Sequence, residues 1–236
     1  MTNLKCIELA DVSYRYEGGA ETVLKNVNAS FESGKVYTII GQSGAGKSTL
    51  LSLISGLDVC KEGEIIYNGN SLRTLDRDDY RAKSVGVVFQ GFNLLLNSTA
   101  LYNITLSMNI SSGNNKDKQA RKEAAYGLLK KVGIDCETAD RKILQLSGGE
   151  QQRVGIARAL SHDPDVIIAD EPTGNLDADT EKSVLDILVK LAHEENKCVI
   201  IVTHSENVTA IADEVIGIQA GRLLRISADA AAGGSS

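Results

Sequence analysis

A glycine-rich turn between a strand-like run and a helix-like run carries the clearest chemistry in the sequence. It reads Gly41, Gln42, Ser43, Gly44, Ala45, Gly46, Lys47, Ser48 and Thr49. Glycines let the backbone turn tightly and point successive N–H groups inward, and the positive end of the following helix attracts anions. We therefore expect a polyphosphate here, with Lys47 reaching the β- and γ-phosphates and the Ser48 hydroxyl completing the coordination of Mg²⁺. The alternative, a Gly/Ser-rich turn that binds nothing, fits the flanking strand and helix less well.

Two adjacent carboxylates, Asp170 and Glu171, follow the apolar run 166–169. A carboxylate at the tip of a buried strand needs a compensating cation, and Mg²⁺ held by Ser48 supplies one if this strand lies beside the glycine-rich turn. Asp170 is then the metal partner, and Glu171 can accept a proton from a water that attacks the γ-phosphorus. The alternative is an acidic pair that caps a helix at the strand exit.

Two further polar side chains end apolar runs. His204 follows residues 199–203, and Gln90 follows residues 85–89. Ligands gather at the carboxyl ends of parallel strands, so we expect His204 to reach the γ-phosphate and help hold the attacking water and Glu171. The Gln90 carbonyl oxygen can reach a metal ion or water. Each residue could equally be ordinary surface at a strand end.

The elements that position these side chains follow from the apolar pattern. Residues 36–40, 85–89, 166–169 and 199–202 lack a polar face, which suits a buried parallel sheet. Residues 6–9, 12–14 and 27–31 alternate weakly, which predicts antiparallel hairpins. No comparable strand occurs between Gly91 and Leu146, where one helical face is predicted from Ala120, Ala124, Ala125, Leu128, Leu129 and Val132. We interpret this stretch as an inserted helical subdomain.

Composition limits the function classes. The 236 residues suffice for one large α/β domain or one domain with an insertion. The formal charge of −6 arises from 31 acidic and 25 basic side chains without a basic block, so no nucleic-acid partner is expected. No apolar stretch reaches the roughly 18 residues that span a bilayer, and the start of the chain lacks a signal-peptide core, which predicts a cytoplasmic protein.

A second glycine-containing motif reads Leu146, Ser147, Gly148, Gly149, Glu150, Gln151, Gln152 and Arg153. It resembles the signature motif of ATP-binding-cassette (ABC) ATPases and lies between Gln90 and Asp170, in the order of that family. Partial matches in one consistent order are more specific than any one of them. The resemblance implies ATP and Mg²⁺ as cofactors, and ATP hydrolysis coupled to transport as the activity.

The resemblance also implies a fold and a domain plan. It predicts an α/β protein with a P-loop NTPase (RecA-like) core of mostly parallel sheet, an N-terminal antiparallel β subdomain and an inserted α-helical subdomain. Residues 1–227 form a single domain, in which residues 1–90 and 147–227 make the ATP-binding core with the β subdomain and residues 91–146 make the helical subdomain. Residues 228–236 are expected to be a disordered tail.

Carried over position by position, the resemblance gives each candidate residue a role. It makes Tyr16 the aromatic residue that stacks on adenine, with Tyr14 as its competitor. The remaining assignments are residues 41–49 as the phosphate loop, Gln90 as a switch glutamine and metal ligand, Asp170 as the second metal-site residue, Glu171 as the catalytic base, His204 as the switch histidine, and Asn175, Leu176 and Asp177 as the loop that crosses to a partner subunit.

The signature motif provides a second helix N-terminus suited to an anion. Ser147 stands where an N-cap would, and Gly148 and Gly149 allow close backbone approach. In this family the two phosphate-binding helix ends of one chain do not face each other. The resemblance thus implies a head-to-tail homodimer in the ATP-bound state, in which Ser147, Gly148, Gly149 and Gln151 of one copy close on the phosphate loop of the other.

A cassette of this kind transmits its motion to a separate integral membrane permease, so it is expected to lie peripherally on the inner face of the cell membrane. The family docks its permease on the helical subdomain, roughly residues 91–105. The apolar side chains there suit a groove or a core equally, and they are Phe92, Leu94, Leu95, Leu96, Leu101, Tyr102 and Ile104.

Residues 89–95 and 170–177 resemble the subgroup that serves macrolide export, lipoprotein release and antimicrobial-peptide resistance. Export or mechanotransmission is therefore the expected output. Residues 96–100 lack the proline common in that subgroup, which weakens any inference about which permease docks. The alternatives are a cell-division or envelope mechanotransmitter that moves no solute, and a soluble non-transport ABC ATPase.

Overall fold

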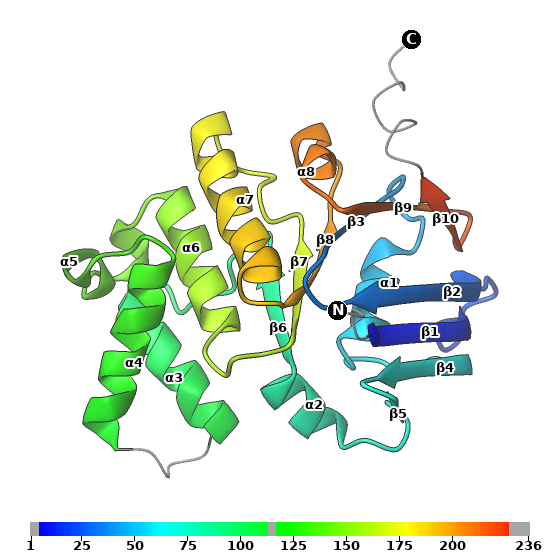
Figure 1. The fold of residues 1–236 in the computed structure, drawn as a ribbon, viewed down its shortest axis with the longest axis horizontal. Helices are drawn as coiled ribbons and strands as arrows, with labels where there is room; N and C mark the ends of the chain where they lie inside the picture. Colours follow the sequence, from blue (N-terminus) through cyan, green and yellow to red (C-terminus); the bar gives the residue numbers. More distant parts are fainter. Residues whose placement is uncertain (1–4, 113–116, 227–236) are drawn as a thin grey trace.

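The computed structural model describes residues 5–112 and 117–226, which form two sheets and a group of helices (Figure 1). The larger sheet has six strands in the order β10-β9-β3-β8-β7-β6. They are β3 (Val36–Ile40), β6 (Val85–Phe89), β7 (Val166–Asp170), β8 (Cys198–Val202), β9 (Glu214–Gln219) and β10 (Arg222–Ile226). β10 pairs antiparallel with β9, and the other pairings are parallel. The predicted, mostly parallel sheet is confirmed.

Strand β7 shows that this sheet is buried on both faces. Val166 and Ile168 belong to one apolar cluster, whereas Ile167 and Ala169 belong to the other. Successive side chains of a strand point to opposite faces, so a strand covered on both sides needs an unbroken apolar run. This run ends at Asp170, which leaves the first polar side chain at the carboxyl edge of the sheet.

The smaller sheet is antiparallel and has the order β2-β1-β4-β5, as predicted for the N-terminal part. Its strands are β1 (Lys5–Tyr14), β2 (Leu24–Glu32), β4 (Glu62–Tyr67) and β5 (Asn70–Ser71). Residues 6–9 and 12–14, predicted as separate segments, belong to one strand. Asp11 has a left-handed φ of 49° at the register shift with β2, so a bulge bends β1 without ending it.

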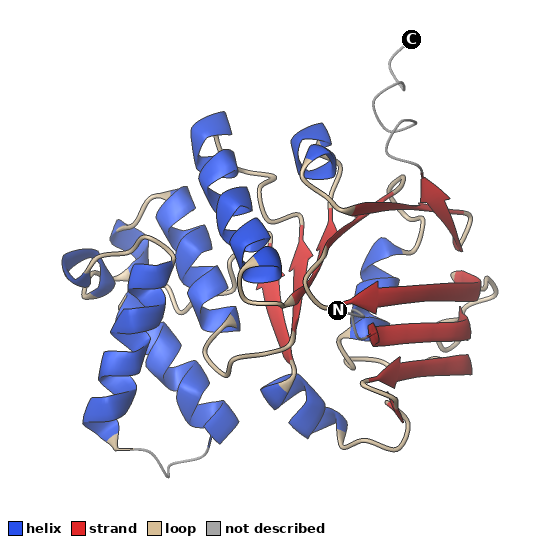
Figure 2. Cartoon of the chain, in the orientation of Figure 1, coloured by secondary structure: helices blue, strands red, loops and turns tan. Residues whose placement is uncertain are grey.

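The helices gather mainly beside β6, whereas the smaller sheet lies at the opposite end of the molecule (Figures 1 and 2). They are α1 (Lys47–Ile54), α2 (Arg77–Lys83), α3 (Ala100–Ser112), α4 (Lys118–Lys131), α5 (Cys136–Ala139), the 3₁₀ helix η2 (Ile143–Gln145), α6 (Gly148–Ala159), α7 (Ala178–His193) and α8 (Glu206–Ala210). Within the described ranges, none has the length and apolar character needed to cross a bilayer.

The buried face of α4 differs from the predicted one. Ala120 and Ala124 are exposed, because the buried stripe runs through Arg121, Ala125 and Leu129. These three residues are four positions apart and therefore lie on one face of the helix. The predicted helix is present. Its predicted buried face was wrong by one residue in the N-terminal half of the helix.

The helical segment shares its apolar core with the larger sheet. Ile104 of α3, Leu129 of α4, Ile156 of α6 and Ile167 of β7 belong to one cluster. The segment is thus held against the sheet by common packing, and its limits at residues 91 and 146 remain a prediction. The predicted tail, residues 228–236, lies outside the described residues.

Candidate functional site

The glycine-rich turn joins β3 to α1 at the carboxyl edge of the larger sheet. A side chain at Gly41 would come within 2.5 Å of the Ile218 carbonyl oxygen, so only glycine fits beside β9. Gly46 is the N-cap of α1, with a left-handed φ of 107° and no side-chain cap. The N–H groups that begin an α-helix lack partners within the helix, so this end is suited to an anion.

Lys47 turns its ammonium group back into this loop. Its Nζ donates to the carbonyl oxygens of Gly41 at 2.7 Å and Gln42 at 3.1 Å. A third contact, at 3.2 Å, joins Nζ to Nε2 of His204. An ammonium group only donates, so Nε2 is the acceptor and the ring proton of a neutral His204 is on Nδ1. The charge of Lys47 therefore lies at the end of the loop, held by oxygens that a phosphate can replace.

Strand pairing brings the other candidate residues to the same edge. Phe89 pairs with Asp170, and Asp170 pairs with Val202, so the segments that leave β6, β7 and β8 start side by side. The Glu171 N–H donates to the Val202 carbonyl oxygen at 2.9 Å, which extends the pairing by one residue. Gln90 lies against the next turn, since a side chain at Gly174 would come within 3.0 Å of the Gln90 Nε2.

Glu171 and His204 face each other across this edge. Glu171 Oε1 lies 3.4 Å from His204 Nε2, and the His204 N–H donates to Glu171 Oε2 at 3.3 Å. Glu171 adopts a left-handed φ of 46°, which is uncommon for a residue with a side chain and is found most often at functional sites. The side chain of His204 is 57% exposed and that of Glu171 is 20% exposed, so a ligand can reach both.

Asp170 is the candidate metal partner. Burial raises the pKa of its carboxyl group, nearby Glu171 raises it further, and Lys47 acts in the opposite direction. α1, which carries the exposed Ser48, packs on β7. The described residues hold no cluster of three or more His, Cys, Asp or Glu side chains arranged for a metal. A carboxylate, a hydroxyl and an amide oxygen fit Mg²⁺, which keeps water and phosphate among its ligands.

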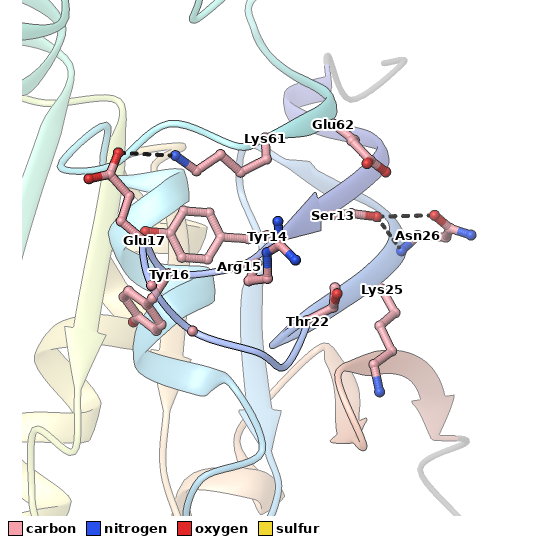
Figure 3. A pocket seen from close by; sticks show the side chains of 12 residues that line it. Ser13, Tyr14, Arg15, Tyr16, Glu17, Thr22, Lys25, Asn26, Lys61 and Glu62 are labelled. Carbon is pink, nitrogen blue, oxygen red and sulfur yellow. Dashed lines mark hydrogen bonds and ion pairs between the residues drawn. The ribbon is translucent and has the colours of Figure 1, made fainter.

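Tyr16 and Tyr14 differ sharply in exposure. Tyr16 is 51% exposed and its hydroxyl is 2.8 Å from Thr49 Oγ1, whereas Tyr14 is 4% exposed and its hydroxyl donates to Asp58. Figure 3 shows both rings at a pocket of about 820 Å³. Residues 13–19 contribute to its lining and none of residues 41–49 does, so this pocket is distinct from the glycine-rich turn.

The signature motif forms the N-terminus of α6, and its own side chains cap it. Ser147 is the N-cap, and its hydroxyl accepts from the Glu150 N–H at 3.3 Å. Glu150 Oε2 accepts in return from the Ser147 N–H at 2.7 Å and from the Ser147 hydroxyl at 2.9 Å. The Gln151 amide donates to the Leu146 carbonyl oxygen at 2.9 Å. Our sequence reasoning missed Glu150, although serine followed three residues later by glutamate is a capping-box pattern.

The N-termini of α1 and α6, the two helix ends suited to an anion, do not meet within one chain. The phosphate loop follows β3, while α6 packs on β6. β8 and β7 lie between these strands, and neighbouring strands are spaced by about 4.8 Å, which separates β3 from β6 by roughly 14 Å. Gly148 and Gly149 instead lie beside Leu176 and Thr180, at the start of α7. A side chain at Gly149 would collide with Thr180 Cγ2.

Comparison with known proteins gives a consistent result. Residues 24–174 match the family described as ABC transporter. The chain is 44% identical over 218 residues to the uncharacterized ABC transporter ATP-binding protein YclH of Bacillus subtilis, with 92% of this chain and 95% of that protein covered. It is 39% identical over 226 residues to the macrolide export ATP-binding/permease protein MacB of Mannheimia succiniciproducens, covering 94% of this chain and 34% of that protein.

A solved structure matches almost the whole chain. It is a dimeric, post-hydrolysis state of the ATP-binding cassette MJ0796 of Methanocaldococcus jannaschii, bound to ADP and Pi. The match has a TM-score of 0.84 and 36% sequence identity, and it covers 94% of this chain and 99% of that chain.

Proposed function

The chain belongs to the ABC transporter family as an ATP-binding subunit with ATPase activity, and from this membership we propose that two copies close head to tail around two ATP molecules. The observation that carries the hydrolytic role is the convergence of Lys47, Glu171 and His204 at one sheet edge, where His204 Nε2 lies 3.2 Å from Lys47 Nζ and 3.4 Å from Glu171 Oε1. A cation, a carboxylate and an imidazole in contact supply charge stabilisation, proton acceptance and orientation for hydrolysis of a phosphoanhydride.

ATP occupies the phosphate loop, where residues 41–49 surround the phosphates and Lys47 exchanges its carbonyl contacts for phosphate oxygens. The half-exposed ring of Tyr16 stacks on adenine, since Tyr14 is buried and its hydroxyl is engaged by Asp58. Ser48, Asp170 and Gln90 would hold Mg²⁺, which neutralises developing charge on the phosphates. The donor set is built of oxygens, as this ion requires.

Glu171 acts as the base that accepts a proton from the attacking water. His204 orients that water and donates from Nε2 to the γ-phosphate, once Nε2 no longer accepts from Lys47 and carries the ring proton. The contact between Glu171 Oε1 and His204 Nε2, at 3.4 Å, supports this division of labour because both groups reach the same space. Glu171→Gln tests it: ATP turnover should be abolished while ATP binding is retained. A variant that hydrolyses ATP at the parent rate refutes the role of Glu171 as base.

A second copy of the chain completes the site. Ser147, Gly148, Gly149 and Gln151 close on the γ-phosphate held by the partner's loop, and the segment of Asn175, Leu176 and Asp177 crosses the interface. The separation of α6 from the phosphate loop within one chain supports this arrangement, as does the dimeric state of the related cassette. ATP favours the closed pair because it contacts both copies only there, and hydrolysis removes that preference.

The moving pair drives a separate membrane permease, which docks on the helical segment and holds the protein at the inner face of the cell membrane. Exposure divides the apolar residues of this segment. Leu94 and Ile104 are core, while Leu95, Leu96 and Tyr102 are 47%, 48% and 51% exposed. Leu144 is 62% exposed, and its N–H donates to the Leu96 carbonyl oxygen, so it extends the same surface. These exposed side chains are the proposed docking surface.

We infer export or mechanotransmission as the output, of an antibiotic, peptide or lipoprotein, on the resemblance of residues 89–95 and 170–177 to that subgroup. The relative named as a macrolide export ATP-binding/permease protein supports this direction. Co-purification of untagged membrane partners tests the proposal. Recovery of a permease with importer-type substrate dependence would contradict it.

A further inference from the structure

Three hydrogen-bond donors converge on the carboxylate of Glu181, in the first turn of α7. Thr173 Oγ1 and Ser205 Oγ donate to its Oε1, at 3.0 Å and 2.9 Å. Asn207 Nδ2 donates to its Oε2 at 2.9 Å. Glu181 belongs to none of the motifs described above, and its partners come from two different segments of the chain.

These two segments are the ones that carry Glu171 and His204. Thr173 lies two residues after Glu171, on the segment that leaves β7, and it is buried. Ser205 directly follows His204, on the segment that leaves β8, and Asn207 lies in the first turn of the short helix α8 beyond it. Glu181 thus links the exits of two neighbouring strands from outside the sheet.

The direct contacts between Glu171 and His204 are longer than the bonds to Glu181. The bond from the His204 N–H to Glu171 Oε2 measures 3.3 Å, beyond the usual range for strong hydrogen bonds, and the 3.4 Å approach of Glu171 Oε1 to the acceptor Nε2 is not a hydrogen bond. Glu171 also holds a left-handed φ, a conformation that persists only when surrounding contacts fix it. The three bonds to Glu181 are shorter and have an ionised acceptor, which makes each stronger than a neutral bond.

The charge state of Glu181 fits this role. Its hydrogen bonds, that from Asn207 foremost, lower the pKa of its carboxyl group, and the N-terminal turn of a helix also favours a negative charge. The carboxylate is therefore ionised when ATP is hydrolysed, and its two oxygens accept hydrogen bonds from all three donors.

We propose that Glu181 is a positioning residue for ATP hydrolysis, which holds the segment of Glu171 and the segment of His204 in register. It touches neither ATP nor the attacking water and acts through Thr173 and Ser205. The proposal rests on the proposed function, in which Glu171 and His204 act on the same water.

The test compares Glu181→Ala with Glu181→Gln in steady-state ATP hydrolysis. Glu181→Ala should lower kcat about 10-fold, because the charge-assisted hydrogen bonds that hold the two segments are lost, while KM for ATP stays within about twofold. Glu181→Gln keeps an acceptor oxygen for Thr173 and Ser205 and should recover most of kcat. Asp179→Ala, which removes another acidic residue from the same turn, is the matched control and should resemble the parent.

A merely structural role predicts a different result. Parental kcat in folded Glu181→Ala overturns the proposal, and so does a loss of kcat matched by an equal rise in KM. Where circular dichroism shows that Glu181→Ala does not fold, Ser205→Ala replaces it: a fall in kcat of about threefold at constant KM supports the proposal, and an unchanged kcat overturns it.

Glu171→Gln separates this proposal from the proposed function. If Glu171→Gln is inactive and Glu181→Ala is fully active, only the role of Glu181 fails. If Glu171→Gln retains turnover, the assignment of the base fails first. Trapping of the ATP-bound pair by Glu171→Gln, with and without Glu181→Ala, gives a readout besides turnover, and the second change should leave the trapped fraction unaltered.

Discussion

The N-termini of α1 and α6 are both suited to phosphate, but only that of α6 is capped by side chains. The N-cap of α1 is Gly46, which offers no side-chain cap, and the neighbouring Lys47 donates to carbonyl oxygens that a ligand can replace. The N-cap of α6 is Ser147, whose N–H and hydroxyl both donate to the carboxylate of Glu150. The first end is open to an anion, while the second already contains one.

This difference suggests an order of events. A hydroxyl has a single proton, so Ser147 cannot donate it to Glu150 and to a phosphate oxygen together. In the proposed dimer, ATP therefore binds first at the open α1 end of one copy, and the α6 end of the other copy engages only when closure brings phosphate near enough to displace Glu150. A single chain should show ATP affinity that depends on α1 and hardly at all on α6.

The strongest test of this contrast removes the cation at the open end. Lys47→Ala should weaken ATP binding at least about 100-fold, because two or more charge-assisted hydrogen bonds of roughly 1.5–3 kcal/mol each are lost. Titration calorimetry with ATP and Mg²⁺ measures the effect on the dissociation constant. Unchanged nucleotide binding would dispose of the phosphate-loop assignment.

The matching change at the capped end should leave binding alone and affect turnover. Ser147→Ala should lower kcat about 100-fold, the scale for loss of one donor to a developing charge, while ATP affinity of the single chain is unaltered. Loss of the cap costs about 1 kcal/mol of folding stability, which thermal unfolding by circular dichroism detects separately. Equal losses of binding and turnover would erase the contrast between the two ends.

A smaller effect is expected at the adenine platform beside the open end. Tyr16→Ala should weaken ATP binding about 10-fold, since stacking of a base on an aromatic ring is worth roughly 1–3 kcal/mol. Tyr14→Phe removes a buried hydroxyl from Asp58 and is the control, with ATP affinity near the parent value. A fluorescent ATP competition assay distinguishes them, and a larger loss in Tyr14→Phe would reverse the assignment.

The smallest expected effect comes from Glu150, which distinguishes the capped α6 end from the open α1 end. Glu150→Gln keeps an acceptor for the Ser147 N–H but removes the negative charge from the α6 end. ATP-driven pairing should become about 2- to 5-fold tighter, the scale of roughly 0.3–1 kcal/mol for a charge at a helix end. Sedimentation equilibrium in the Glu171→Gln background measures this. Weaker pairing would mean that the carboxylate assists closure.

The strands that carry the site could be predicted because they are buried on both faces. β3, β6, β7 and β8 appear in the sequence as largely apolar runs, and β6, β7 and β8 end at or directly before a polar residue, on the same sheet edge as the glycine-rich turn after β3. β4 was not predicted, because it carries an exposed Glu62 and a half-buried Glu64 and includes Gly63. The pattern of apolar residues in a sequence indicates which segments are buried. Half-exposed strands at the edges of sheets therefore show little of this pattern.

The roles of single side chains were also predictable only where the signal is local in the sequence. The order of motifs identified the phosphate loop and the carboxylates, but exposure separates Tyr16 from Tyr14 and Leu95 from Leu94, and exposure is a tertiary property. Glu150 carried a local signal in its spacing from Ser147. Glu181 carried none, because Thr173 and Ser205 become neighbours only through the parallel pairing of β7 with β8.

The central claim is that ATP is enclosed between two copies of this chain, each contributing the end that the other lacks. Sedimentation velocity of Glu171→Gln with ATP and Mg²⁺ tests it most directly. We predict a dimer with ATP and a monomer with ADP or without nucleotide. A protein that sediments as a monomer at saturating ATP, with its membrane partners supplied, would contradict the account.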